Sequence, residues 1–62
     1  MKRIKLYING FEWWLDKTVS PPKVYLTETC NEGVSIYSKH FTLDENRQVS
    51  DFIKYGKNNE NG

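Results

Sequence analysis

Residues 4–15 read IKLYINGFEWWL, two runs of largely alternating side chains joined by Asn9 and Gly10. Asn-Gly between such runs is the strongest short-range signal for a β-hairpin, because a type I′ turn needs positive φ at both central residues. With these two residues in the turn, the strands pair outward from it, beginning with Ile8 and Phe11. The pattern therefore predicts a hairpin together with its register.

This register gives the hairpin two different faces. The apolar face carries Ile4, Leu6, Ile8, Phe11, Trp13 and Leu15. The mixed face carries Arg3, Lys5, Tyr7, Glu12, Trp14 and Asp16. Side chains on the mixed face pair with complementary partners, and Trp14 is a large aromatic residue on the side that we expect to meet water. We therefore treat the mixed face as a candidate functional surface.

Pro21 and Pro22 must end the first hairpin, because proline lacks an N–H donor and restricts the residue before it to extended conformations. Beyond them, residues 23–30 and 34–41 are rich in β-branched and aromatic side chains, which favour strands. The loop between these runs ends in Gly33, which suits the left-handed position of a bulged three-residue turn. The sequence therefore predicts a second hairpin.

The three-residue loop sets a register in which Cys30 faces Val34 and Val24 faces His40. The side chains of this hairpin that we expect in the core are Val24, Leu26, Val34 and Ile36. The other side pairs Thr27 with Tyr37, Tyr25 with Lys39 and Lys23 with Phe41. A two-residue turn at Glu32 and Gly33 is the alternative, and it would shift every pair.

A helix follows the strands. Thr42 and Glu45 have the spacing of a capping box, in which each side chain accepts from the other residue's backbone N–H. The apolar residues Val49, Phe52 and Ile53 recur at helical spacing, and Gly56 suits a C-terminal cap. We expect a helix from about Leu43 to Tyr55 and a disordered polar tail over 57–62.

These elements predict an α+β fold: a four-stranded, mainly antiparallel sheet with the helix on one face, forming a single domain over residues 1–56. The expected core is Ile4, Leu6, Ile8, Phe11, Trp13, Leu15, Val24, Leu26, Val34, Ile36, Val49, Phe52 and Ile53. The opposite sheet face would be exposed to water and carry the aromatic and charged side chains.

Composition excludes several classes of function. Sixty-two residues with nine basic and eight acidic side chains leave little room for a substrate cleft and create no strong field for nucleic acid. A single cysteine, Cys30, suits a reducing compartment, and the sequence has no apolar run of the ~20 residues that cross a membrane. We expect a cytoplasmic protein without membrane contact. Its small size and abundance of lysine and asparagine suit a phage or another mobile element.

The sequence offers no catalytic motif. The predicted register places Cys30 and His40 about 20 Å apart, too far to share a metal ion. Glu28 lies near 13 Å from His40 in the same register, too far to orient it as a base. No glycine-rich phosphate loop occurs. We therefore expect no enzyme activity, no cofactor and no metal.

The mixed sheet face remains as the candidate binding site, with Arg3, Lys5, Tyr7, Trp14, Lys23, Tyr25, Tyr37 and Lys39 as its predicted residues. Tryptophan and tyrosine dominate protein-binding hot spots, and charges of both signs would form the rim. This favours a regulator or inhibitor that docks on a protein partner. The simpler interpretation is that Lys5 packs on Trp14 only to stabilise a solvated sheet.

Nucleic-acid binding is the alternative, with lysines on phosphates and aromatic rings on bases. The order of strands followed by Lys39-His40-Phe41-Thr42 and a helix is loosely similar in architecture to the three-stranded-sheet DNA-binding domains of integrases. That similarity implies a strand surface that meets DNA. A homodimer is a third possibility, because so small a domain gains stability by association.

Overall fold

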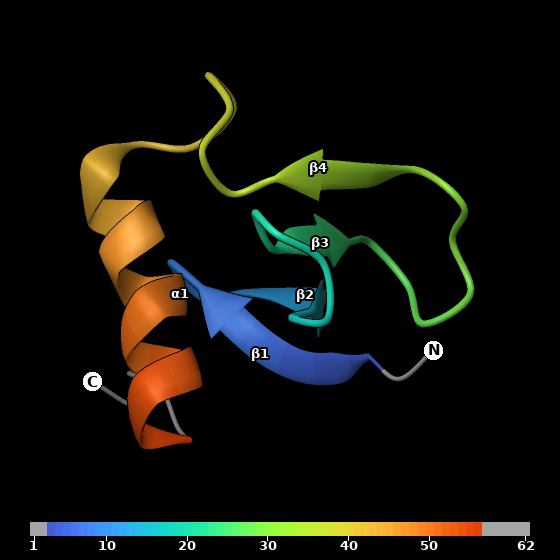
Figure 1. The fold of residues 1–62 in the computed structure, drawn as a ribbon, viewed down its shortest axis with the longest axis horizontal. Coiled ribbons are helices and arrows are strands. Elements are labelled where there is room, and N and C mark those ends of the chain that lie inside the picture. Colours follow the sequence, from blue (N-terminus) through green and yellow to red (C-terminus); the bar gives the residue numbers. More distant parts are fainter. Residues whose placement is uncertain (1–2, 57–62) are drawn as a thin grey trace.

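Two hairpins in series build one antiparallel sheet in the computed structural model, which describes residues 3–56. The strands are β1 (Ile4–Ile8), β2 (Phe11–Asp16), β3 (Lys23–Tyr25) and β4 (Gly33–Ser35), and the helix is α1 (Leu43–Tyr55). The sheet order follows the chain, β1-β2-β3-β4, with α1 against β1 (Figure 1). The predicted α+β fold is confirmed. The predicted tail, 57–62, lies outside the described residues.

The first hairpin has the predicted register, from Ile8 opposite Phe11 to Ile4 opposite Leu15. Its turn is left-handed at both central residues, with φ of 52° at Asn9 and 84° at Gly10. Such angles suit asparagine and glycine and strain other residues. The local sequence alone is therefore enough to fix the pairing of β1 with β2.

The helix also begins and ends where the sequence predicts. The reciprocal Thr42 and Glu45 bonds of the capping box are present, and Gly56 closes the helix in the left-handed region with its N–H on the Phe52 carbonyl, 2.7 Å away. A connection that the sequence did not reveal joins this helix to the first hairpin. Gln48 Oε1 accepts from the Asn9 backbone N–H at 2.9 Å, and Gln48 Nε2 donates to Asn9 Oδ1 at 2.7 Å.

The core lies between the sheet and α1. Its fully buried members are Leu6, Ile8, Leu15, Val24, Ile36 and Val49, with Trp13, Val34, Phe41 and Phe52 packed against them. Three predicted core residues are exposed instead: Phe11 by 75%, Leu26 by 64% and Ile53 by 36%. The helix packs on β1, so it covers Ile8 and leaves Phe11 at the start of β2 open to water.

The second hairpin differs from both predicted registers. Its strands have three residues each, and Val24 faces Val34 rather than His40. Residues 26–32 form a loop, on the side of the sheet away from α1 (Figure 1). Gly33 does not have the positive φ expected of a bulge. Its hydrogen atom makes room for the Tyr25 ring, because a Cβ there would lie 2.5 Å from Tyr25 Cζ.

The chain after β4 turns instead of continuing as a strand. Ser38 N–H donates to the Ser35 carbonyl at 3.1 Å, and Phe41 N–H donates to the Ser38 carbonyl at 3.2 Å. These turns bring Phe41 back to the core, where its ring meets Trp13 edge-on with centroids 5.4 Å apart. Phe41 was predicted on the mixed face, so that placement is wrong. The predicted strand over 34–41 ends at Ser35 for this reason.

Candidate functional site

One row of side chains crosses the whole sheet on the face turned away from Val49. In this row Lys5 of β1 faces Trp14 of β2, Trp14 faces Tyr25 of β3, and Tyr25 faces Gly33 of β4. We call this side the outer face; by register it carries Lys5, Tyr7, Glu12, Trp14, Asp16, Lys23, Tyr25, Gly33 and Ser35. Arg3 belongs to it through its contact with the Tyr25 ring. Opposed residues on neighbouring strands have Cβ atoms about 5 Å apart. Trp14 and Tyr25 are opposed residues of neighbouring strands, and the Tyr25 ring lies close to Gly33 on the next strand.

Lys5 sits between a ring and a carboxylate. Its Nζ lies 5.9 Å from the centroid of the Trp14 ring and 4.0 Å from Glu12 Oε1. The Lys5 and Glu12 side chains are both about half exposed, so the pair adds little stability. The pair matters instead for the electrostatic potential of the outer face, because Glu12 offsets the positive charge that Lys5 would present to an anionic ligand.

Arg3 faces the 26–32 loop. Its Nη1 donates to the carbonyl oxygens of Glu28 and Cys30, each at 2.8 Å, and lies 3.2 Å from that of Thr27. The guanidinium carbon also lies 3.5 Å from the centroid of the Tyr25 ring. Planar stacking together with several donors is a combination that arginine provides and lysine does not. Arg3 thereby links the outer face to the loop beside it.

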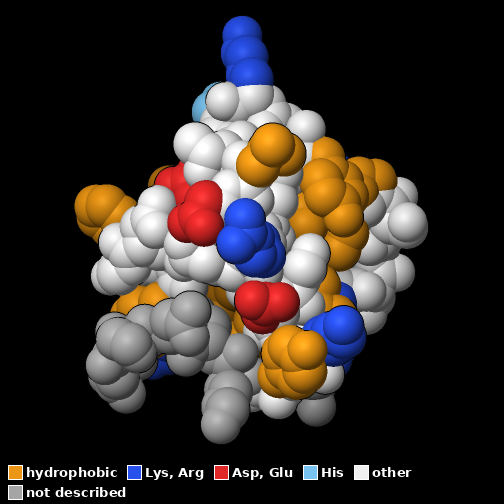
Figure 2. Space-filling view, turned by 90° about the vertical axis from the view of Figure 1, so that its left-hand side faces the viewer, with side chains coloured by type: hydrophobic (Ala, Val, Ile, Leu, Met, Phe, Trp, Pro, Cys, Tyr) orange, Lys and Arg blue, Asp and Glu red, His pale blue; other side chains and the backbone are white. Residues whose placement is uncertain are grey.

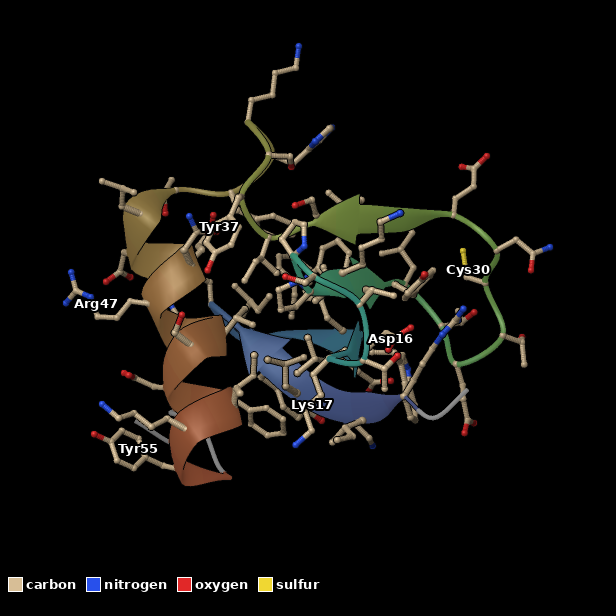
Figure 3. All side chains as sticks on the ribbon, viewed as in Figure 1. Asp16, Lys17, Cys30, Tyr37, Arg47 and Tyr55 are labelled. Atoms are coloured by element: carbon tan, nitrogen blue, oxygen red, sulfur yellow. The ribbon has the colours of Figure 1, made fainter. Side chains whose placement is uncertain are left out.

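Asp16 was predicted on the exposed mixed face, but it is only 2% exposed. Its Oδ1 accepts from the hydroxyl of Thr18 and, at 2.9 Å, from the Thr18 backbone N–H. These two bonds hold the pKa of Asp16 below its ordinary value of 3.8, the positive charge of Arg3 adds to them, and desolvation opposes them. Asp16 therefore fastens the chain that leaves β2 (Figure 3).

The structure brings six of the eight predicted site residues onto the outer face and leaves two elsewhere. The six are Arg3, Lys5, Tyr7, Trp14, Lys23 and Tyr25. Tyr37 and Lys39 lie in the turns between β4 and α1, and Figure 3 shows Tyr37 beside the helix. Both were placed on the sheet by the wrong register of the second hairpin. The residues that sequence reasoning missed are those of the loop held by Arg3, since no local motif marks that contact.

Reactive side chains are dispersed. Cys30 lies in the loop at the side of the molecule opposite α1 (Figure 3), with its Sγ 3.6 Å from the Glu32 carbonyl. The exposed His40 contacts Ser38, with Nδ1 and Oγ 3.3 Å apart. Within residues 3–56, no three His, Cys, Asp or Glu residues gather in a way that could hold a metal ion. The helix in this part of the chain is too short and too polar to cross a membrane.

The helix side presents a different kind of surface. Figure 2 shows charges of both signs there, with one larger hydrophobic patch toward the right of the view and other hydrophobic side chains set apart from one another. Leu43 and Tyr55 of α1 are exposed by 83% and 64%, and Figure 3 shows Tyr55 and Arg47 pointing away from the sheet. Singly exposed apolar residues are normal on protein surfaces. The outer face differs because its register sets Trp14 opposite Tyr25 on neighbouring strands.

Comparison of the chain with protein-family models, with curated proteins and with solved structures finds no match. We therefore infer the function from the geometry of the outer face.

Proposed function

We propose that this chain is a small non-catalytic binding protein that docks its outer face on a protein partner, as a regulator or inhibitor acting in the cytoplasm. The observation that carries the proposal is the cross-strand row in which Trp14 and Tyr25 lie side by side. Tryptophan and tyrosine side chains bury a large area at low cost in side-chain entropy, and they form the centre of many protein interfaces.

The charges around the row favour a protein over a nucleic acid. Arg3 directs its donors to loop carbonyls, Lys5 lies beside Glu12, and Lys39 is away from the face. A nucleic-acid site needs several cations that meet phosphates together. Lys23, exposed on the outer face two residues before Tyr25, suits one carboxylate of a partner. The occupant we propose is a protein segment with aliphatic side chains for the aromatic row and an acidic side chain for Lys23.

The test begins with peptides selected against the wild-type protein from a random displayed library. The tightest peptide is then titrated into Trp14→Ala and into Phe11→Ala. Phe11 is a matched control, because it is an exposed aromatic residue of the same strand that points to the opposite face. We expect Trp14→Ala to weaken binding at least 30-fold, the size of a hot spot of ~2 kcal/mol, and Phe11→Ala to change it less than threefold. Equal losses would contradict the proposal.

Nucleic-acid binding is tested in parallel by titrating single- and double-stranded DNA at roughly 50 mM and 200 mM salt, with tryptophan fluorescence as the readout. We expect no saturable response. Saturable binding that weakens steeply with salt and is reduced in Lys23→Ala would replace the proposed protein partner with a nucleic acid.

A further inference from the structure

The loop over 26–32 is held from a distant part of the chain. Arg3 lies 24 to 27 positions before the loop carbonyls that it binds, and one guanidinium nitrogen meets three of their oxygens. Within the loop, the contact between the Cys30 N–H and the Thr27 carbonyl is a long 3.4 Å. Charge-assisted hydrogen bonds are stronger than neutral ones. Arg3 therefore links this loop to the sheet through charge-assisted hydrogen bonds.

The same guanidinium fixes an aromatic ring of the outer face. Tyr25 has the Arg3 guanidinium stacked on it at 3.5 Å, and its ring also reaches the backbone of Gly33. A Cβ at Gly33 would come within 2.6 Å of two ring carbons of Tyr25, so any side chain there would displace the ring. Arg3, earlier in the chain, and Gly33, later in the chain, thus set the position of the Tyr25 ring.

We propose that Arg3 is a positioning residue of the docking surface. It fixes the Tyr25 ring and the 26–32 loop, so that a protein partner meets a preformed aromatic row bordered by this loop. This inference rests on the proposed function. Leu26, which directly follows Tyr25 and begins the loop, is exposed by 64%. A surface ordered before binding loses less conformational entropy when the partner arrives.

This role differs from a direct charge contact with the partner. A direct contact depends mainly on positive charge, which lysine retains. Positioning depends on a planar group that stacks on the Tyr25 ring while its Nη1 reaches the loop carbonyls, a combination that lysine does not provide. Arg3→Lys therefore separates the two roles, and Gly33→Ala displaces the ring while it leaves Arg3 in place.

The first measurement uses the free protein. A glutamate-specific protease cleaves after Glu28 only when the loop opens, because the Glu28 carbonyl is bound by Arg3. We expect Arg3→Lys to raise the rate of cleavage at this bond at least fivefold and both Arg3→Lys and Gly33→Ala to shift the ring proton resonances of Tyr25. Thr42→Ala, which weakens the helix cap far from the loop, serves as the control for general destabilisation and should leave the Tyr25 resonances in place. Wild-type cleavage rates and Tyr25 resonances in Arg3→Lys would overturn the inference.

The second measurement titrates the selected peptide into the same variants. We expect Arg3→Lys and Gly33→Ala each to weaken binding five- to tenfold, while Thr42→Ala binds as the wild type does. Wild-type affinity in Arg3→Lys together with a loss in Arg3→Ala would show a direct charge contact and overturn the positioning role. If Trp14→Ala also binds normally, the proposed function fails, whereas the protease result still reports whether Arg3 orders the loop.

Discussion

Replacement of Asn9 by alanine should remove about half of the stability of this domain. Asn9 has a φ of 52°, and its side chain donates to Glu45 Oε2 at 2.6 Å and accepts from Gln48 Nε2 at 2.7 Å. A left-handed alanine costs about 1 kcal/mol, and two exposed hydrogen bonds add about 0.5 kcal/mol each. The sum is about 2 kcal/mol, against the ~3–5 kcal/mol expected of so small a core.

Urea denaturation followed by tryptophan fluorescence measures this loss, and Asn9→Gly separates its two parts. Glycine accepts the left-handed angle, so Asn9→Gly should cost only about 1 kcal/mol. In a double-mutant cycle with Gln48→Ala, we expect a coupling energy of about 0.5–1 kcal/mol. Equal costs for Asn9→Gly and Asn9→Ala would refute the backbone argument. Additive costs in the cycle would refute the link between hairpin and helix.

Three further outcomes follow from the core, the helix cap and the buried carboxylate. Leu15→Ala should leave the chain largely unfolded at 25 °C by circular dichroism, because a fully buried leucine is worth about 2–5 kcal/mol; a cooperative transition near that of the wild type would contradict this. Thr42→Ala should cost about 1 kcal/mol in urea and Thr42→Ser almost nothing, and equal losses would exclude the cap as the cause. The pKa of Asp16 is lowered in the folded state. Its contribution to the free energy of unfolding is therefore complete above its ordinary pKa of 3.8 and is lost as the pH falls toward the folded pKa. In Asp16→Asn, stability should therefore fall less steeply below about pH 4. An unchanged pH dependence in this range would contradict a stabilising role for the bonds from Thr18.

The elements that could be predicted from sequence are those built from local contacts. The Asn9-Gly10 turn and the Thr42 capping box are each specified within a few residues, and the structure places both as expected. Hairpin and cap rules describe such short-range preferences. For the same reason, the row from Lys5 to Trp14 on the outer face followed directly from the first turn.

The second hairpin could not be predicted because long-range contacts determine it. Residues 26–30 were predicted as part of a strand from their composition, yet the carbonyls of Thr27, Glu28 and Cys30 bind Arg3, which is far away in sequence. Gly33 read as a bulge glycine, yet the Tyr25 ring is what excludes a side chain there. Tertiary contacts commonly override strand propensity in this way. Tyr37 and Lys39 left the predicted site as a consequence.

The most direct test of the docking surface is chemical-shift mapping of the isotope-labelled protein during titration with the selected peptide. We predict that the largest amide shifts occur at Lys5, Trp14 and Tyr25, with smaller shifts in the 26–32 loop. Phe11 and Tyr55, exposed elsewhere, should keep their positions. Shifts centred on the helix, with the outer-face amides unchanged, would contradict the central claim that Trp14 and Tyr25 form the binding surface.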